Sequence, residues 1–385
     1  MRILHLFSNY KWTGPADPAV TLAAAQQDAG HDVTFRSSGY LKGGENYLQQ
    51  RARRLGIEVV IDLELRKHRT LMQNMGDVRK LTKLLAAEQP DIVHCHQAND
   101  YRITRRALAR LARSGTPTPP LIRTVYDTDP DQVTGAMAAE LRESSAALLV
   151  FSQRVIARLI ELGVPAQQIQ HLNTSVDLER FDPTREMKDL RGDFDFDQDD
   201  FLVGIVARVQ PQRRFDLLLD TAELLRERCP RFRLIVIGRG SKLEWVARQP
   251  ARERGLLDQN VFFPGYFYDD EYPLMLRMLD AKLFMVPGTD GTARAVREAL
   301  ATGLPVVCTR RGMLPELVQD GETGYVIDET PEDLAAAIQR LHDDPALRQR
   351  LGAAARQYAQ ENFRIDQQRD TSIDVYEQCL ARAQS

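Results

Sequence analysis

The segment that decides the fold has three parts, Ala281-Lys-Leu-Phe-Met-Val-Pro287, Asp290-Gly-Thr-Ala-Arg-Ala-Val-Arg-Glu298 and Ala299-Leu-Ala-Thr-Gly-Leu-Pro-Val-Val307. The first part is an apolar run that predicts a buried strand. A turn that contains glycine follows, and residues 292–302 then predict a helix. Because free backbone N–H groups and the helix dipole both favour negative charge at a helix start, this junction predicts an anion site.

Two carboxylates frame the junction. Asp290 lies at the expected entrance of the helix and Glu298 lies about two turns inside it, so both side chains can face one groove. The backbone N–H groups can bind an anion, and the carboxylates beside them can accept hydrogen bonds from hydroxyl groups. This combination suits a ligand with a diphosphate and several hydroxyls. The sequence therefore predicts that a phosphorylated, hydroxyl-rich molecule binds here.

Strand and helix patterns alternate along the whole chain of 385 residues. An apolar run at 1–7, a turn at Gly14, helical spacing at 19–29 and a second apolar run at 30–35 form a strand–helix–strand unit. A second series of the same kind begins at Phe201. This alternation predicts an α/β protein with two doubly wound parallel sheets, whose ligands bind at the carboxyl ends of the strands.

We expect an N-terminal domain over residues 1–180 and a second domain over 201–365. Residues 181–200 are interpreted as a linker, because the stretch 185–200 holds six aspartates and shows little periodicity. A last helix is expected over about 366–385. No internal repeat or low-complexity stretch is visible beyond the shared α/β pattern.

The charge balance limits the classes of partner. A net charge of −3 implies no general affinity for nucleic acid. Residues 1–180 hold 23 basic and 19 acidic side chains, a net +4, and the remainder holds 28 and 35, a net −7. The N-terminal half is therefore the half expected to meet an anionic acceptor or membrane surface, although the arginines at 102–113 are better interpreted as a solvated helix face.

The cysteines and the apolar stretches indicate the compartment. Cys95, Cys229, Cys308 and Cys379 lie far apart and form no C-x-x-C pair, which fits a reducing compartment and argues against a disulfide framework or zinc knuckle. No stretch approaches the roughly 20 apolar residues of a membrane span, and no secretory signal is evident. We expect a cytoplasmic protein, with peripheral contact at the inner face of the membrane as an open alternative.

The acidic-x7-acidic pattern from Asp290 to Glu298, followed by Ala-x3-Gly-x-Pro-Val-Val, resembles the signature of retaining, nucleotide-sugar-dependent glycosyltransferases of family 4. The usual first acidic residue there is Glu, and Asp290 departs from it. The resemblance covers almost the whole chain. It implies the GT-B architecture, two Rossmann-like domains facing a central cleft, with the acceptor in the first domain, the donor in the second, and the last helix crossing back to the first.

The resemblance also implies a donor site in the second domain. Arg208 and Arg213 occupy the positions of an arginine and a lysine that neutralise the departing diphosphate, and Arg214 stands where relatives have glycine. Asp290 would bind sugar hydroxyls and Glu298 the ribose. The remaining implied contacts with the donor are Gly238, Tyr266, Gly291, Thr292 and Ala293. Arg294 is an additional cation inside the motif that would contact the phosphate or the acceptor.

The resemblance also covers three residues of the N-terminal half: His96 matches the family's strand that ends in histidine, whereas Gly14 and Tyr126 depart from the pattern. Gly14 stands where relatives have a glycine-rich loop, and here a proline follows it. His96 ends a strand, on the same side as His94 and opposite Cys95, so a His-Cys-His metal site is not expected. Tyr126 takes the place of a histidine that reaches the transferred sugar in relatives.

These observations predict a retaining hexosyltransferase of polysaccharide biosynthesis that is metal-independent and needs no cofactor. Its partners would be a nucleotide-diphospho-sugar, most plausibly UDP-linked, and a hydroxyl acceptor that is a glycan, a lipid-linked sugar or a small molecule. A sugar-nucleotide epimerase or phosphorylase and a non-catalytic nucleotide-sugar-binding protein stay open as alternatives. A dinucleotide-dependent dehydrogenase is disfavoured, because no G-x-G-x-x-G follows the first strand.

Overall fold

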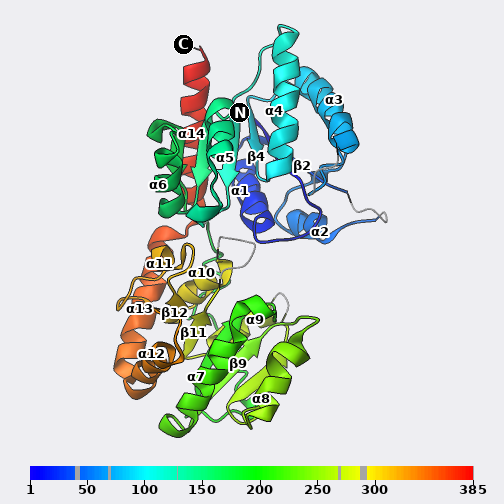
Figure 1. Ribbon diagram of the computed structural model, residues 1–385. Helices are drawn as coiled ribbons and strands as arrows, with labels where there is room; N and C mark the ends of the chain where they lie inside the picture. The colour runs from blue at the N-terminus through cyan, green and yellow to red at the C-terminus, as the bar shows by residue number, and fades with distance from the viewer. Residues whose placement is uncertain (40–43, 68–70, 128, 268–269, 287–292, 385) are drawn as a thin grey trace. The chain divides into compact units, whose positions relative to one another are not determined.

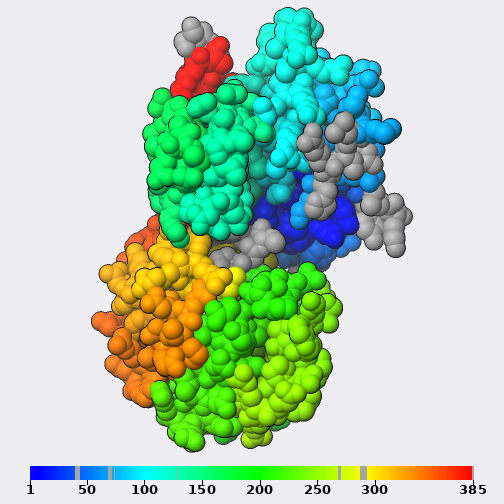
Figure 2. All heavy atoms as spheres, viewed as in Figure 1, coloured from blue at the N-terminus to red at the C-terminus, as the bar shows by residue number. Residues whose placement is uncertain are grey.

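The computed structural model describes residues 1–39, 44–67, 71–127, 129–267, 270–286 and 293–384. Its described residues divide into two compact units, each with its own parallel sheet (Figures 1 and 2). The first unit comprises 1–175 together with the last helix, and the second comprises 176–286 and 293–364. The prediction of two parallel-sheet α/β domains is therefore confirmed.

Sheet A of the first unit has the strand order β3-β2-β1-β4-β5-β6-β7. Its strands are β1 (Arg2–Phe7), β2 (Asp32–Ser37), β3 (Val59–Val60), β4 (Ile92–Cys95), β5 (Leu121–Val125), β6 (Ala147–Val150) and β7 (Ile169–His171). Its α-helices are α1 (Ala16–Asp28), α2 (Tyr47–Arg54), α3 (Leu71–Glu88), α4 (Ala98–Arg113), α5 (Gly135–Ser144), α6 (Gln153–Glu161) and α14 (Ile365–Gln384). The helix α14, red in Figure 1, packs against α1 and β6.

Sheet B of the second unit has the order β10-β9-β8-β11-β12-β13. Its strands are β8 (Phe201–Val206), β9 (Phe232–Ile237), β10 (Val261–Gly265), β11 (Ala281–Phe284), β12 (Val306–Thr309) and β13 (Gly324–Ile327). Its α-helices are α7 (Phe215–Arg228), α8 (Gln249–Glu253), α9 (Glu271–Arg277), α10 (Arg294–Ala301), α11 (Leu314–Leu317), α12 (Pro331–Asp343) and α13 (Pro345–Asn362), and a π-helical turn at Glu244–Arg248 precedes α8.

The Asp-rich segment 181–200 lies within the second unit. Arg191 forms an ion pair with Asp280 at 2.9 Å, and the ring of Phe196 packs edge-on against Phe262 at 4.9 Å. A short 3₁₀ turn at Gly192–Phe194 gives the segment local structure. The boundary between the units thus falls after Ser175, before the segment that the sequence suggested as a linker.

Alternation along the strands sorts side chains between the two faces of sheet A. Leu4 and Leu6 of β1 join the core that α3 and α4 cover, whereas Phe7 joins the core beneath α1 and α2. Cys95 lies on the α4 side, where its thiol donates a hydrogen bond to Thr104. His94 and His96 lie on the opposite side from Cys95, with ring centroids 4.2 Å apart, which confirms the prediction for these three residues.

Two α-helices among the described residues, α2 and α11, were not predicted from the sequence. Only Leu48 and Ala52 of α2 are buried, so apolar periodicity is weak there, and its start is instead set by a capping box between Asn46 and Gln49. The helix α11 has only four residues, too few to show a helical period. Among the described residues, no helix is long and apolar enough to cross a membrane.

Each sheet has one position, called its switch point, where the strand order reverses. In sheet A, β1 pairs with both β2 and β4, and in sheet B, β8 pairs with both β9 and β11. The connections that leave β1 and β4 at their carboxyl ends run in opposite directions, as do those that leave β8 and β11. Ligands of such sheets bind in the crevice outside these strand ends.

Candidate functional site

The connection after β8 carries the three arginines singled out from the sequence. Arg208 is exposed and forms no hydrogen bond or ion pair with any other described residue. Arg213 is half-buried and its guanidinium donates to the carbonyl of Val286 at 2.5 Å, which joins this connection to the end of β11. The switch point of sheet B is therefore lined by two cations, of which Arg208 faces solvent.

Arg214 has a different role from its two neighbours. Its φ of 57° lies in the left-handed region, where glycine is at no disadvantage and other residues lose about 1–2 kcal/mol. This conformation explains why glycine suits the position in the resembling family. The Arg214 guanidinium forms ion pairs with Asp216 at 3.1 Å and with Glu329 at 2.6 Å.

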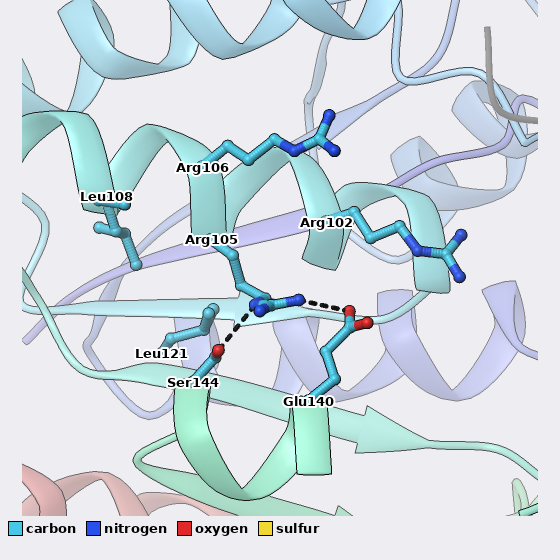
Figure 3. Close-up of a pocket in the computed structure, with 8 residues that line it drawn as sticks. Arg102, Arg105, Arg106, Leu108, Leu121, Glu140 and Ser144 are labelled. Carbon is cyan, nitrogen blue, oxygen red and sulfur yellow. Dashed lines mark hydrogen bonds and ion pairs between the residues drawn. The ribbon is translucent and has the colours of Figure 1, made fainter. Parts of the chain in front are cut away.

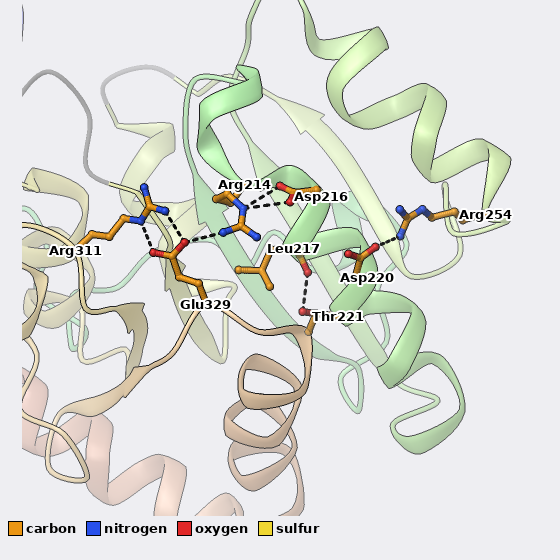
Figure 4. Close-up of polar contacts among 8 residues, drawn as sticks. All are labelled: Arg214, Asp216, Leu217, Asp220, Thr221, Arg254, Arg311 and Glu329. Atoms are coloured by element: carbon orange, nitrogen blue, oxygen red, sulfur yellow. Dashed lines mark hydrogen bonds and ion pairs between the residues drawn. The ribbon is translucent and has the colours of Figure 1, made fainter.

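The Glu329 carboxylate connects Arg214, which follows β8, to the ends of two further strands (Figure 4). Its carboxylate also accepts hydrogen bonds from Arg311, which follows β12, and this pairing holds the pKa of Glu329 below its ordinary value. Because Glu329 itself follows β13, the three side chains fasten the carboxyl ends of β8, β12 and β13 together. Arg214 is thus engaged in holding the site, whereas Arg208 is open to a ligand.

The helix α10 follows the predicted anion-binding turn. Ala293 precedes it with a φ of 45°, and Asp290, Gly291 and Thr292 lie outside the described residues. Glu298, only 6% exposed, accepts a hydrogen bond from the Tyr272 hydroxyl at 2.9 Å and lies 3.4 Å from Nε of Arg294. Burial and the neighbouring Glu298 raise the pKa of Tyr272 well above its ordinary value, so the phenol stays protonated and donates.

A buried lysine in sheet B lies close enough to Glu298 to feel its charge. Lys282 of β11 is fully buried, and its ammonium group has two long contacts, 3.5 Å to the carbonyl of Gly204 and 3.4 Å to that of Leu283. Burial lowers the pKa of Lys282 to about 7, an effect that Glu298 partly opposes. The sequence reasoning missed Lys282 and Tyr272, although a lysine inside the apolar run 281–287 was a visible signal.

Glycines allow the connections after β8 and β9 to run in close contact. A Cβ atom at Gly238 would lie 2.0 Å from the carbonyl oxygen of Ala207, and one at Gly240 would lie 2.4 Å from that of Val209. Tyr266, which follows β10, is 46% exposed and has the guanidinium of Arg239 at 4.7 Å from its ring centroid. The structure therefore places Gly238 and Tyr266 at the same edge of the sheet as Arg208.

At the switch point of sheet A, His96 and Tyr126 belong to a buried hydrogen-bonded chain. His96 Nδ1 lies 2.9 Å from the Tyr126 hydroxyl, and its Nε2 lies 2.9 Å from Nδ1 of His5. His5 Nε2 lies 2.8 Å from Oε1 of Gln26. Burial lowers the pKa of His5 to about 4 and that of His96 well below its ordinary value, so both rings are neutral.

The partners of Gln26 fix the direction of this chain. The Ser372 hydroxyl donates to the carbonyl of Arg369, so it accepts from the amide nitrogen of Gln26, whose oxygen then faces His5. His5 must therefore donate from Nε2 and accept at Nδ1, which requires a proton on Nε2 of His96. Tyr126 then donates to Nδ1 of His96, so both ring nitrogens of His96 are occupied.

The other N-terminal features lie apart from this chain. Gly14 lies in the turn before α1 and is half-buried. A pocket of about 520 Å³ opens between α4 and α5, beside the start of β5, and is lined by Arg102, Arg105, Arg106, Leu108, Ala109, Leu121, Glu140 and Ser144 (Figure 3). Arg105 is paired with Glu140 at 2.7 Å, whereas Arg102 and Arg106 are exposed on α4. This pocket is not at the carboxyl ends of the strands.

The structure thus brings together one set of predicted residues in each unit. Arg208, Arg213, Arg214, Gly238, Tyr266, Arg294 and Glu298 lie along the carboxyl edge of sheet B, and His96 and Tyr126 lie at that of sheet A. A doubly wound sheet with cations and a helix start at its switch point belongs to the class of nucleotide- and phosphate-binding α/β domains.

Comparison with known proteins defines the family. Residues 18–180 match the model of "Glycosyltransferase Family 4" and residues 186–358 match that of "Glycosyl transferases group 1". The chain belongs to this glycosyltransferase family and has its two-domain GT-B fold.

Sequence relatives and solved structures agree with this assignment. A GDP-mannose-dependent phosphatidylinositol monomannoside mannosyltransferase of Mycolicibacterium smegmatis is 31% identical over 52% of this chain and 53% of its own length. A D-inositol 3-phosphate glycosyltransferase of Thermomonospora curvata is 32% identical over 64% and 60%. The structure of Anabaena Alr3699/HepE in complex with UDP has a TM-score of 0.81 at 19% identity, covering 98% of this chain and 100% of that one. The chain spans about half the length of the mannosyltransferase.

Proposed function

We propose that this chain is a retaining glycosyltransferase that moves a hexose from a nucleotide-diphospho-sugar, UDP-linked, to the hydroxyl group of a glycan, a lipid-linked sugar or a small molecule. The observation that carries the proposal is the carboxyl edge of sheet B. There the exposed Arg208, the half-buried Arg213 and the start of α10 lie with Glu298 around one switch point. Cations for a diphosphate next to a carboxylate for hydroxyl groups fit such a donor.

Charge development explains why these residue types suit the reaction. Departure of the nucleotide diphosphate places negative charge on its oxygens, and preorganised cations and amides stabilise that charge. Arg208 is assigned to this role because no other described residue pairs with it, and Arg213 supports it from the same connection. Glu298 is assigned to the ribose hydroxyls, with Tyr272 and Arg294 orienting its carboxylate. Asp290 keeps its proposed role toward the sugar.

His96 and Tyr126 receive a narrower assignment than the sequence suggested. Their polar atoms are bonded to each other within the buried chain. We propose that they position the carboxyl ends of β4 and β5 around the acceptor rather than exchange protons with it. Gly14, in the turn that follows β1, is assigned to the same side.

Calorimetric binding of UDP, GDP and ADP, each with and without magnesium, tests the donor site. We expect metal-independent binding of UDP that falls about 100-fold in Arg208→Ala and at least tenfold in Glu298→Gln, which preserves the hydrogen bond from Tyr272. Arg350→Ala removes an exposed arginine of α13 and should leave the affinity unchanged. Unchanged affinity in both site variants, with the fold intact, would remove the donor site from this edge.

Turnover separates the proposal from its alternatives. Transfer of sugar to an added acceptor with the anomeric configuration kept supports a retaining transferase. Conversion of the nucleotide-sugar without an acceptor would indicate an epimerase, and donor binding without either reaction would indicate a non-catalytic binding protein.

GDP-mannose is the second candidate donor. The observation that favours it is the 31% identity to a relative named as GDP-mannose-dependent. Tighter binding of GDP than of UDP in the same calorimetric series would select it.

The exposed arginines of α4 suggest an anionic surface as a further partner of the first unit. Figure 2 shows this helix, in cyan, at the surface of that unit. Co-sedimentation with vesicles that contain anionic lipid, compared with neutral vesicles, tests it, and an Arg102→Ser and Arg106→Ser double variant should lose any such binding. Equal sedimentation with both vesicle types would show that α4 is a solvated face.

A further inference from the structure

Two clusters of side chains with metal-ligating atoms occur among the described residues. One consists of His5, His94 and His96, and the other of Cys229, His342 and Asp343. In the histidine cluster every ring nitrogen has a hydrogen-bond partner and all three rings are fully buried. A metal ion there would have to break that network, so this cluster carries no metal proposal.

The second cluster is built at the ends of two neighbouring helices. Cys229 follows the last residue of α7, His342 and Asp343 end α12, and α7 and α12 pack against each other. One donor atom from each side chain, a thiol sulfur, an imidazole nitrogen and a carboxylate oxygen, lies within 4.8 Å of the other two. His342 Nδ1 is 2.7 Å from Oδ1 of Asp343.

The surroundings of this cluster contain negative groups and one adjacent cation, the exposed Arg228 that precedes Cys229. Two helices end here, and the carboxyl end of a helix carries partial negative charge and carbonyls without intrahelical partners. Asp344 takes no part, because its carboxylate caps α13 by accepting from the backbone N–H of Leu347. The positive charge of the nearby Arg348 is directed elsewhere, to the carbonyl of Leu341 at 2.7 Å and to Asp280 at 3.6 Å.

In this cluster the ring of His342 is restrained by packing, and part of the cluster is exposed to solvent. The His342 ring meets Phe201 edge-on, with centroids 5.4 Å apart, which limits its rotation. Cys229 is buried, whereas the side chains of His342 and Asp343 are 27% and 55% exposed. The thiol thus belongs to the hydrophobic core of the second unit, and the imidazole and the carboxylate beside it are open to solvent.

We propose that Cys229, His342 and Asp343 bind one Zn²⁺ ion, with water as the fourth ligand. Sulfur, nitrogen and oxygen donors are the set that zinc takes in proteins, at about 2.0–2.3 Å in a tetrahedral arrangement. Donors around such an ion are about 3.3–3.6 Å apart, so small side-chain rotations from the present positions complete the site. On binding, the Cys229 thiol releases its proton to solvent and the imidazole–carboxylate hydrogen bond gives way to two metal bonds.

The position in the sheet defines the role of the ion. The carbonyl of Cys229 accepts from the backbone N–H of Phe232, the first residue of β9, and Phe201 is the first residue of β8. The cluster therefore lies at the amino ends of the strands, at the opposite edge of sheet B from Arg208 and Glu298. The zinc ion fastens α7 to α12 and takes no part in donor binding.

Cobalt titration of the full chain, freed of any affinity tag and stripped with a chelator, tests this site. We expect one equivalent of Co²⁺ to produce thiolate-to-cobalt charge-transfer absorption, zinc to displace it, and zinc to raise the thermal unfolding midpoint. Cys229→Ser should abolish the absorption, and Cys379→Ser, which alters another buried cysteine, should leave it unchanged. Absorption that persists in Cys229→Ser would overturn the proposal.

A second variant covers the case in which Cys229→Ser does not fold. Asp343 has an exposed side chain, so Asp343→Asn should preserve the fold and lower zinc affinity about tenfold or more. Equal zinc affinity in this variant and in the unaltered chain would contradict the site. Nucleotide calorimetry on zinc-loaded and stripped protein should give the same affinity, and a difference would contradict the assigned position and role.

Discussion

At the switch point of sheet A a buried chain of neutral histidines is internally hydrogen-bonded, with the buried Asp100 and Arg123 beside it, whereas sheet B carries a buried carboxylate, Glu298, together with the exposed Arg208. His5, His96 and Tyr126 satisfy each other without a formal charge. In sheet B, Lys282 and Glu298 are buried, whereas Arg208 at the carboxyl edge is exposed. The same strand topology thus carries a neutral histidine chain in one unit and an exposed arginine near a buried carboxylate in the other. The two units should respond differently to pH and to substitution.

The largest expected effect concerns Lys282. Between its ordinary pKa of 10.5 and its folded value of about 7, the unfolded chain holds this proton and the folded chain does not, so stability falls as pH is lowered through that range. At 1.36 kcal/mol per pKa unit the loss at pH 7 is about 4 kcal/mol. Urea unfolding of Lys282→Met should show a stability advantage over the unaltered chain that is about 4 kcal/mol larger at pH 7 than above pH 10.5.

Lys242→Met is the matched control for this experiment. Lys242 is exposed in the same unit, so its replacement should change stability by no more than about 0.5 kcal/mol at either pH. A pH-independent difference between Lys282→Met and the unaltered chain would mean that the buried ammonium is better compensated than its contacts indicate.

The next largest effect is expected in the first unit, where the histidine chain should reduce stability at acid pH. The pKa of His5 is lowered from 6.5 to about 4, so the unfolded chain takes up this proton first and stability is lost as pH falls from 6.5 through 4. The loss is about 3 kcal/mol for this imidazole. His5→Asn should flatten the acid limb of the stability curve, and His171→Asn, at a half-buried histidine of β7, should not. Equal acid limbs in all three proteins would contradict the neutral chain.

The ion pairs of Glu329 with Arg214 and Arg311 form a clamp between strand ends, and removing this clamp should have an intermediate effect on stability. Glu329→Gln removes the charge that holds Arg214 and Arg311, which should cost about 1–2 kcal/mol of stability because the pairs are partly exposed. The pKa of Glu329 is lowered, so its contribution is present above its ordinary pKa and is lost as pH falls through the folded value. Denaturant unfolding should therefore show the variant and the unaltered chain converging at acid pH.

Glu332→Gln removes the same charge from an exposed position in the first turn of α12, which should cost only about 0.3–1 kcal/mol through the helix dipole, and serves as the control. A cost for Glu329→Gln no greater than that for Glu332→Gln would show that the clamp adds nothing to stability.

An effect on stability of the same size, without an effect on nucleotide affinity, is expected at Tyr126. Tyr126→Phe leaves Nδ1 of the buried His96 without its donor, which should cost about 1–2 kcal/mol of stability. Nucleotide affinity should be unchanged, because the hydroxyl faces the histidine chain. Unfolding curves and nucleotide calorimetry on one preparation check both statements. A tenfold fall in nucleotide affinity would show that Tyr126 contacts the donor and would break the contrast between the units.

Local patterns were sufficient for most of the fold. Strands were predicted at 1–7, 30–35 and 281–287, and the structure has them at Arg2–Phe7, Asp32–Ser37 and Ala281–Phe284, because buried parallel strands are short apolar runs between clear turns. The resemblance put Arg208 at the donor site, and the sequence put Glu298 about two turns inside the helix that follows a predicted strand; both lie at the carboxyl edge of sheet B.

Contacts between distant parts of the chain were decided only by the tertiary structure. The sequence showed His94 and His96 on one side of a strand, but not that His5, Gln26 and Ser372 would complete their hydrogen bonds. It likewise could not bring Cys229 beside His342, or show that Arg214 binds Glu329. Periodicity reports the burial of each residue along its own element, whereas pairing across a sheet or between helices depends on strand order and packing, which no local pattern encodes.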